Sequence, residues 1–410
     1  MANEFDSARV RKFKRRREWV LTSFDVNVVP VTIMYQETAK FTETYGFVGS
    51  QGMVVLEGMH FMPSDHPSET IVLMMHPSST LQQLPIPSAL AAAGVHLMCC
   101  GSRYPKNDTA LIMEKVVLDL GAYVRHAKEK LGYQNVVLLG WSGGGSLSLF
   151  YQAEAENPTL KETPAGDPVD LTAAGLIPAD AVMFIAAHKS RAVTLTEWLD
   201  ASVLDELDPD ARDPELDIYN LENINQPPFT RVFLSRYRDA QIARNRKITA
   251  WVREMLEDLQ RRDNGEVERG FVVHRTMADP RWLDPAVDPN GRKPNWCYLG
   301  DPRAVNNGPA GLARFSTLRA WLSQWSYDDS QADGARSAER ISVPFLAIEN
   351  GADDACPSSH AKDIYAAAAS KDKEIRLIEG AGHYYKGQPD KLDEAVAVLS
   401  GWLSRHGLSA

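Results

Sequence analysis

A serine set among glycines is the first feature of this sequence that could perform chemistry. The segment Gly140-Trp141-Ser142-Gly143-Gly144 lies between two apolar runs. Small neighbours permit a sharp strand-to-helix turn that strains the serine backbone and exposes its hydroxyl. The N–H of Gly143 would then lie at a helix start, where it can stabilise an oxyanion. The motif therefore predicts Ser142 as a nucleophile and Gly143 as an oxyanion donor.

Two other uses of a glycine-rich turn fit this segment less well. A phosphate-binding P-loop needs G-x-x-x-x-G-K-[ST], and no lysine follows these glycines. A dinucleotide site needs G-x-G-x-x-G directly after a strand, with an acidic residue at the end of the next strand, and the sequence offers neither. The turn is therefore interpreted as one that carries a nucleophilic serine.

An acidic pair and a histidine follow two later strand-like runs. Asp353 and Asp354 come after V-P-F-L-A-I-E-N, and His383 follows L-I-E-G-A-G. A carboxylate at a strand end can accept the Nδ1–H of a histidine and orient its ring. The D-x-x-x-P spacing favours Asp353 over Asp354. Two plainer readings stay open: an Asp-rich turn that caps the helix near Ser358, and a structural histidine.

Strands and helices that alternate along the chain would position these residues. Alternation of this kind predicts an α/β protein with a mostly parallel sheet and helices on both faces. Asp108 is expected to cap the first of the helices, and Gly132 to lie near its end. The predicted strands are 70–76, 95–100, 135–139, 181–187, 343–350 and 374–380, and the predicted helices are 108–132, 143–154, 358–370 and 391–406.

The alternation stops between His188 and Ser342. Polar segments with helical character, such as 248–262 and 313–325, lie there on either side of a loop rich in Pro, Asp and Asn. Because sheet elements flank this stretch on both sides, it is predicted to be an inserted, mainly helical cap domain. The expected division is a core domain of residues 1–188 and 342–410 and a cap of residues 189–341.

The order Ser142, Asp353, His383 along the chain resembles that of the α/β-hydrolase superfamily. The resemblance rests on G-W-S-G-G, on the strand followed by D-x-x-x-P, and on G-A-G-H, and it covers nearly the whole chain outside the cap. It implies that Ser142 is the nucleophile, His383 the general base and Asp353 the orienting carboxylate.

One segment departs from the family pattern. Many members carry His-Gly after the third strand, whereas this chain has His76-Pro77. Proline has no N–H to donate, so the resemblance points to the N–H of Ser78 as the second oxyanion donor. The alternative is that Ser78 and Ser79 only cap the next helix.

Three further residues are candidates for substrate binding. Trp141 lies inside the nucleophile motif, Arg103 follows the fourth strand and His188 follows the sixth. The carboxyl ends of such strands face the ligand crevice, where a cation could hold a substrate carboxylate. Pairing of that cation with one of the many acidic residues is the other reading.

The composition excludes several classes of protein. The 410 residues carry a net charge of −10, which argues against nucleic acid as a main partner. The basic run 9–17 is not followed by an apolar segment, so it does not resemble a secretory signal, and no stretch is long enough to span a membrane. Of the four cysteines, two are adjacent within an apolar run and two are isolated, so they form neither a disulfide framework nor a zinc motif. This favours a reduced, cytoplasmic protein, and no metal or cofactor is expected.

The leading hypothesis is a serine hydrolase that works through an acyl-enzyme, a carboxylesterase or lactonase. Six of nine tryptophans lie in the predicted cap, which suggests a bulky, partly apolar or aromatic acyl substrate. The same triad serves thioesterases, amidases and C–C bond hydrolases. A ligand-binding protein without catalysis on this fold is a remote alternative. The oligomeric state stays open, and a homodimer is compatible with the sequence.

Overall fold

One large sheet organises the molecule. The computed structural model describes residues 23–37, 52–262 and 264–409. Across the sheet the strand order is β1-β2-β4-β3-β5-β6-β9-β10. The second strand runs antiparallel to both of its neighbours, and all other pairs are parallel. The strands are β1 (Val26–Gln36), β2 (Met53–Pro63), β3 (Thr70–Met75), β4 (Leu97–Cys100), β5 (Asn135–Ser142), β6 (Ala181–Ala187), β9 (Phe345–Asn350) and β10 (Lys373–Ile378).

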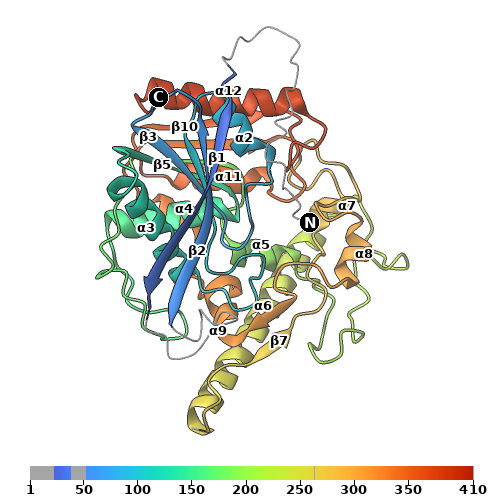
Figure 1. The fold of residues 1–410 in the computed structure, drawn as a ribbon. Helices are drawn as coiled ribbons and strands as arrows, with labels where there is room; N and C mark the ends of the chain where they lie inside the picture. The colour runs from blue at the N-terminus through green and yellow to red at the C-terminus, as the bar shows by residue number, and fades with distance from the viewer. Residues whose placement is uncertain (1–22, 38–51, 263, 410) are drawn as a thin grey trace, which may run out of the picture.

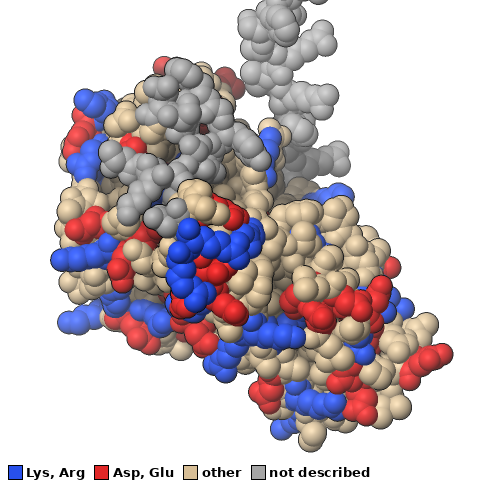
Figure 2. All heavy atoms as spheres, turned by 90° about the horizontal axis from the view of Figure 1, so that it is seen from below, with Lys and Arg blue, Asp and Glu red and all other residues tan. Residues whose placement is uncertain are grey.

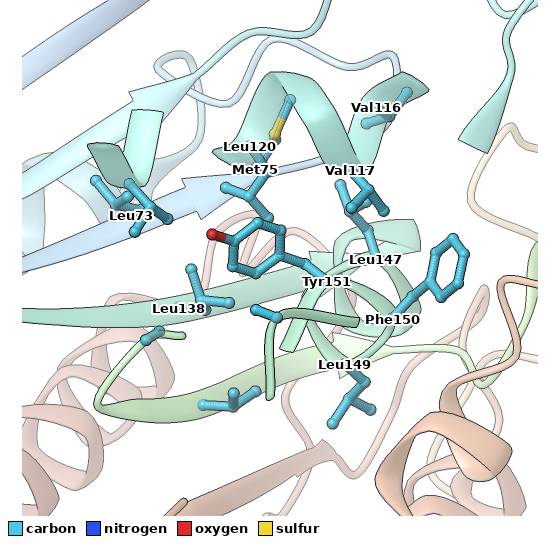
Figure 3. Close-up of a cluster of buried hydrophobic side chains, with 14 of the residues drawn as sticks. Leu73, Met75, Val116, Val117, Leu120, Leu138, Leu147, Leu149, Phe150 and Tyr151 are labelled. Atoms are coloured by element: carbon cyan, nitrogen blue, oxygen red, sulfur yellow. The ribbon is translucent and has the colours of Figure 1, made fainter. Parts of the chain in front are cut away.

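Helices cover both faces of this sheet (Figure 1). Successive residues of a strand point to opposite faces, so Leu73 and Met75 join one buried cluster while Val72 and Met74 join the other. Figure 3 shows the first cluster, in which leucines of β3 and β5 meet side chains of two helices. These helices are α3 (Met113–Glu129) and α4 (Gly143–Glu156), with α10 (Gly334–Ala338) and α11 (Ser358–Ala367) on the same face and α2 (Pro85–Ala92) and α12 (Pro389–Arg405) on the other. The predicted α/β class with a mostly parallel sheet is confirmed.

Between β6 and β9 the chain leaves the sheet. We call residues 189–341 the inserted region; Figure 1 shows most of it as the yellow and orange part beside the sheet, with one long helix extending away from it. A small second sheet pairs two of its segments. Besides α10, which packs on the sheet, its elements are α5 (Arg191–Trp198), α6 (Arg231–Arg262), β7 (Gly270–Val272), α7 (Pro280–Leu283), α8 (Pro302–Asn307), β8 (Phe315–Thr317), α9 (Leu318–Ala320) and the π-helix η1 (Trp321–Trp325).

Two local predictions were wrong. The helix expected from Asp108 begins at Met113, with Ile112 at its N-cap, because the Asp108 carboxylate is engaged elsewhere, 2.5 Å from an Arg191 nitrogen. The segment 313–325, expected to be helical, divides into β8, α9 and η1. Its strand residues pair with β7, which takes them out of any helix.

Acidic and basic side chains are intermixed on the face of the molecule seen in Figure 2. The four cysteines, Cys99, Cys100, Cys297 and Cys356, are buried and free. No helix in the described part of the chain is long and apolar enough to cross a membrane. The basic run 9–17 lies outside the described residues.

Candidate active site

The turn between β5 and α4 holds Ser142 in a strained conformation. Its φ of 55° and ψ of −122° lie in a region that side-chain-bearing residues rarely adopt. Close packing makes the neighbouring glycines necessary. A Cβ on Gly144 would lie 2.0 Å from the Met75 carbonyl oxygen, and a Cβ on Gly140 would lie 2.5 Å from the Gly144 carbonyl oxygen. The sequence therefore builds a tight elbow that presents the Ser142 side chain at the end of the strand.

A histidine and a carboxylate form a buried pair at the same end of the sheet. His383, in the loop after β10, has its Nδ1 atom 2.9 Å from Oδ2 of Asp353 and 3.1 Å from Oδ1. The Asp353 carboxylate also accepts hydrogen bonds from the backbone N–H groups of Ala355 and Cys356, at 2.8 and 2.7 Å. These contacts fix the carboxylate and favour the His383 tautomer that carries its proton on Nδ1, which leaves Nε2 free to accept a proton.

Asp354, the competing acid, is placed differently. Its backbone carbonyl accepts a hydrogen bond of 2.8 Å from the Trp282 indole of the inserted region. Burial, followed by the charge of Asp353, raises the pKa of Asp354 to about 6. The His383 Nδ1–H donates instead to Asp353, the residue that the D-x-x-x-P spacing favours.

Cys356 links Ser142 to this pair and was not singled out in the sequence. The Cys356 thiol lies close to the Ser142 side chain, and burial holds the thiol pKa well above its usual range. In the described part of the chain, no hydrogen bond joins Ser142 directly to His383. The side chain must therefore turn from Cys356 to His383 before it can transfer a proton, as catalytic hydrogen bonds often tighten only with substrate present.

Asp353, Cys356 and His383 are also close enough to hold a metal ion. One ligand atom from each lies within 4.8 Å of the others. Hydrogen bonds already account for the arrangement, because both Asp353 oxygens contact His383 and the neutral thiol contacts Ser142. These contacts suit proton transfer at Ser142 better than the coordination of an ion by a thiolate.

Trp141 packs against His383. Its ring lies 4.6 Å from that of His383, centroid to centroid, and its Nε1–H donates to the His383 carbonyl oxygen at 3.3 Å. The Trp141 side chain is buried. Its observed contacts are thus with the loop that carries His383, and a contact with substrate stays a prediction.

The loop after β3 does not leave the Ser78 N–H free for an oxyanion. The backbone N–H groups of Ser78 and Ser79 both point to Nδ1 of His76, at 3.2 and 2.9 Å. The carbonyl oxygen of Pro77 accepts a hydrogen bond from the Ser102 hydroxyl at 2.5 Å, which fixes the loop further. Because its N–H already donates to His76, Ser78 does not offer a free donor for the oxyanion.

Arg103 lies in an ion cluster of its own. Its guanidinium donates to the Asp119 carboxylate at 2.8 and 3.0 Å and also contacts Glu37 and the Tyr35 hydroxyl. The side chain is buried among these partners. The pairing alternative therefore describes Arg103, and binding of a substrate carboxylate by this residue does not fit the structure.

His188 and Arg191 lie close to the elbow. His188 is buried, and its Nδ1 has no hydrogen-bond partner among the described residues. Burial, followed by the charges of His360 and Arg191, lowers the pKa of His188 well below its usual range. His188 therefore remains neutral, with one ring nitrogen available.

Arg191 is a second residue after β6 that lies beside the elbow. Its Nη1 atom lies 3.5 Å from the position that a Cβ on Gly143 would occupy. The rest of its guanidinium is held by the Asp108 carboxylate, at 2.5 Å, by Gln324, at 3.1 Å, and by the face of the Trp325 ring, 4.3 Å from its centroid. The inserted region thus places an ion-paired arginine beside the elbow.

Comparison with known proteins gives likenesses in structure only. No protein-family model matches the sequence, and no curated protein matches it either. A monoacylglycerol lipase of Paleococcus ferrophilus is 16% identical, with 86% of this chain and 99% of that chain covered and a TM-score of 0.43. Est1E from Butyrivibrio proteoclasticus is 13% identical, with 84% and 93% covered and a TM-score of 0.42. The siderophore hydrolase EstB from Aspergillus fumigatus is 13% identical, with 85% and 94% covered and a TM-score of 0.45.

Similarity at this level leaves the roles of individual residues to be inferred from their own geometry. The sheet order, the strained turn at Ser142 and the hydrogen-bonded pair of His383 and Asp353 come from this chain alone. A strained serine on a G-x-S-x-G turn, followed in the chain by an acid and then a histidine, is the arrangement of the α/β-hydrolase fold. The chain has the α/β-hydrolase fold.

Proposed function

We propose that this protein is a serine hydrolase that cleaves a carboxylic ester or lactone through an acyl-enzyme. One observation carries the proposal: a strained serine ends β5 beside a buried His–Asp pair, with Cys356 in contact with both. The arrangement provides a nucleophile, a base and an orienting carboxylate. None of the three residues is missing or tied into a contact that would prevent its role.

In the proposed reaction the Ser142 hydroxyl attacks the substrate carbonyl while His383 Nε2 takes its proton. Asp353 stabilises the imidazolium that forms. The N–H of Gly143, at the start of α4, faces the negative charge that develops on the carbonyl oxygen. His383 then donates the proton to the leaving alcohol. In the second half of the reaction, water attacks the acyl-enzyme while His383 takes its proton, and His383 returns a proton to Ser142 as the acid is released.

The inserted region is proposed to act as a cap that selects the acyl group. Its Asn290 side chain donates to the Asp353 carbonyl oxygen at 2.9 Å. The Tyr298 ring lies 6.4 Å from that of His383 and 5.6 Å from that of Trp198, centroid to centroid. Aromatic side chains that reach the base in this way support a bulky, partly aromatic acyl substrate.

A substrate panel with one matched variant tests this function. Wild type and Ser142→Ala are compared on p-nitrophenyl esters with acetyl, octanoyl and phenylacetyl groups, on an aromatic lactone, and on thioester, amide and C–C ring-cleavage substrates. The proposal expects the esters or the lactone to be turned over fastest, the bulky acyl groups to be preferred, and Ser142→Ala to be inactive. Turnover confined to the thioester, amide or C–C substrates would replace the ester proposal, and equal activity of the variant would reject the nucleophile.

A further inference from the structure

We propose that the His76 side chain supplies the second hydrogen bond to the oxyanion, through its Nε2–H, in place of a backbone N–H of the loop after β3. The inference rests on the proposed hydrolase function and adds a catalytic residue to it. It answers the question that Pro77 raises, because the loop lacks one N–H there and has turned the next two toward His76.

The hydrogen bonds of the loop fix the tautomer of His76. Its Nδ1 accepts two backbone N–H groups, from Ser78 at 3.2 Å and Ser79 at 2.9 Å. A ring nitrogen that accepts hydrogen bonds carries no proton, so in the neutral ring the proton lies on Nε2. Two backbone N–H groups of the loop are thus used to orient His76, whose Nε2–H then becomes the available donor.

The Nε2–H of His76 lies close to Gly143, the residue that follows Ser142 in the elbow. His76 Nε2 is 2.9 Å from the position that a Cβ on Gly143 would occupy, and Cδ2 is 3.4 Å from it. The ring also lies 6.0 Å from that of Trp141, centroid to centroid, so it stands beside the residues on both sides of Ser142. Among the described residues, Nε2 has no hydrogen-bond partner. Its proton is left for a ligand at the elbow, where the Gly143 N–H also begins α4.

The surroundings keep His76 neutral. Burial lowers its pKa well below the usual range, and the charges of Arg191 and His383 lower it further. A neutral imidazole can donate to a developing oxyanion, and it is not titrated when His383 gains its proton during the reaction. The Arg191 guanidinium, 3.5 Å from the same Gly143 position and paired with Asp108, also lies on this side of the elbow.

The rival explanation is that His76 only anchors the loop, and two amide substitutions separate the roles. In His76→Asn the amide oxygen can take the place of Nδ1 and still accept from Ser78 and Ser79, while nothing donates from the Nε2 position. In His76→Gln the longer side chain places an amide N–H near the Nε2 position but loses the acceptor for the loop. If His76 donates to the oxyanion, His76→Gln should keep more activity than His76→Asn. If His76 only anchors the loop, His76→Asn should keep more activity than His76→Gln.

The experiment measures kcat and KM on the best p-nitrophenyl ester found for the wild type, together with inhibition by a trifluoromethyl ketone that forms a tetrahedral adduct. The proposal expects His76→Asn to lose about 100-fold or more in kcat with little change in KM. Its affinity for the ketone should fall in parallel, and His76→Gln should retain within about tenfold of wild-type kcat. His126→Asn, a part-exposed histidine on α3, controls for the change of imidazole to amide and should behave as wild type.

Results in the opposite order overturn the inference. Equal losses in the two variants, or a larger loss in His76→Gln, mean that His76 anchors the loop and does not touch the oxyanion. A thermal melt of each variant excludes unfolding as the cause. Because the wild type must first turn over the ester, failure of the hydrolase proposal is seen separately from failure of this one.

Discussion

The sheet and the inserted region depend on buried ion pairs to different extents. Between β3, β5, α3 and α4 a large cluster of apolar side chains fills the interior (Figure 3), although α3 also buries Asp119, which pairs with Arg103. The inserted region buries ion pairs: Arg275 lies 2.7 Å from Asp200, and Arg281 lies 2.5 Å from Asp279, with each side chain no more than 7% exposed. An apolar interior follows from periodic sequence, whereas an ionic interior depends on pairs that lie far apart in the chain.

The two regions also contribute differently to the candidate site. The sheet presents Ser142, Asp353 and His383 at strand ends, and tight backbone packing fixes the serine. The inserted region adds contacts around them, from the Trp282 indole and from Arg191 beside the elbow. In our proposal the sheet carries the residues for bond cleavage and the inserted region selects the substrate, and three substitutions test how the two regions differ.

The largest effect is expected in the acid loop of the sheet. Asp353→Asn should lower kcat by about 10⁴-fold, because an amide in that place favours the wrong tautomer of the catalytic histidine. Asp354→Asn, its matched control, should stay within about tenfold of wild type, since the hydrogen bonds of the His383 ring in the described structure go to Asp353. The measurement is steady-state ester hydrolysis, and similar losses in the two variants would contradict the assignment of Asp353.

A buried ion pair of the inserted region should give the next largest effect, on stability. Arg275→Met leaves the fully buried Asp200 without its cation, which should lower the free energy of unfolding by about 3–5 kcal/mol. Arg303→Met, at an exposed arginine of α8, should change it by less than about 0.5 kcal/mol. Urea denaturation checks both, and a small effect at Arg275 would mean that water or other partners compensate Asp200.

The smallest effect is expected where the regions meet, and it depends on pH. Glu114 on α3 accepts a hydrogen bond from the Ser323 hydroxyl at 2.8 Å, while its other oxygen has no partner among the described residues. Burial raises the pKa of Glu114 from 4.5 to about 7. Since the folded pKa is the higher one, this group stabilises the fold below the unfolded pKa, and that contribution is lost as the pH rises through the folded pKa.

Glu114→Gln should therefore gain in stability relative to wild type as the pH rises, by about 3 kcal/mol at most between about pH 5 and about pH 8. Glu129→Gln, an exposed position on the same helix, should give a flat difference. Chemical denaturation at several pH values is the measurement. If the stability difference between Glu114→Gln and wild type were also independent of pH, ionisation of the Glu114 carboxyl would not destabilise the fold.

The sheet and the elbow were predictable because their signals are local. Apolar runs marked β5 and β6, and the glycines around Ser142 are required by contacts within a few residues of the turn or with the neighbouring strand. The acid and the base follow strand ends, which the sequence also marks. Their pairing joins residues 30 positions apart, yet parallel strand ends meet at one edge of a sheet.

The rest depends on partners that no local pattern reveals. Segment 313–325 has helical character, yet part of it pairs with β7, and the Ser323 hydroxyl caps α3 by accepting from the Met113 N–H at 2.8 Å. Arg103 follows a strand end as a ligand-binding cation would, but its partner Asp119 lies on α3. A role for His76 could not be predicted from the sequence, because only the folded loop directs two N–H groups to its ring.

Covalent labelling of Ser142 tests the central claim most directly. Wild type and Ser142→Ala are treated with a fluorophosphonate, which reacts with serines activated by a neighbouring base, and the modified peptide is located by mass spectrometry. The account predicts one adduct per chain, on Ser142, and none in the variant. An unlabelled wild type, or an adduct on another residue that persists in Ser142→Ala, would contradict it.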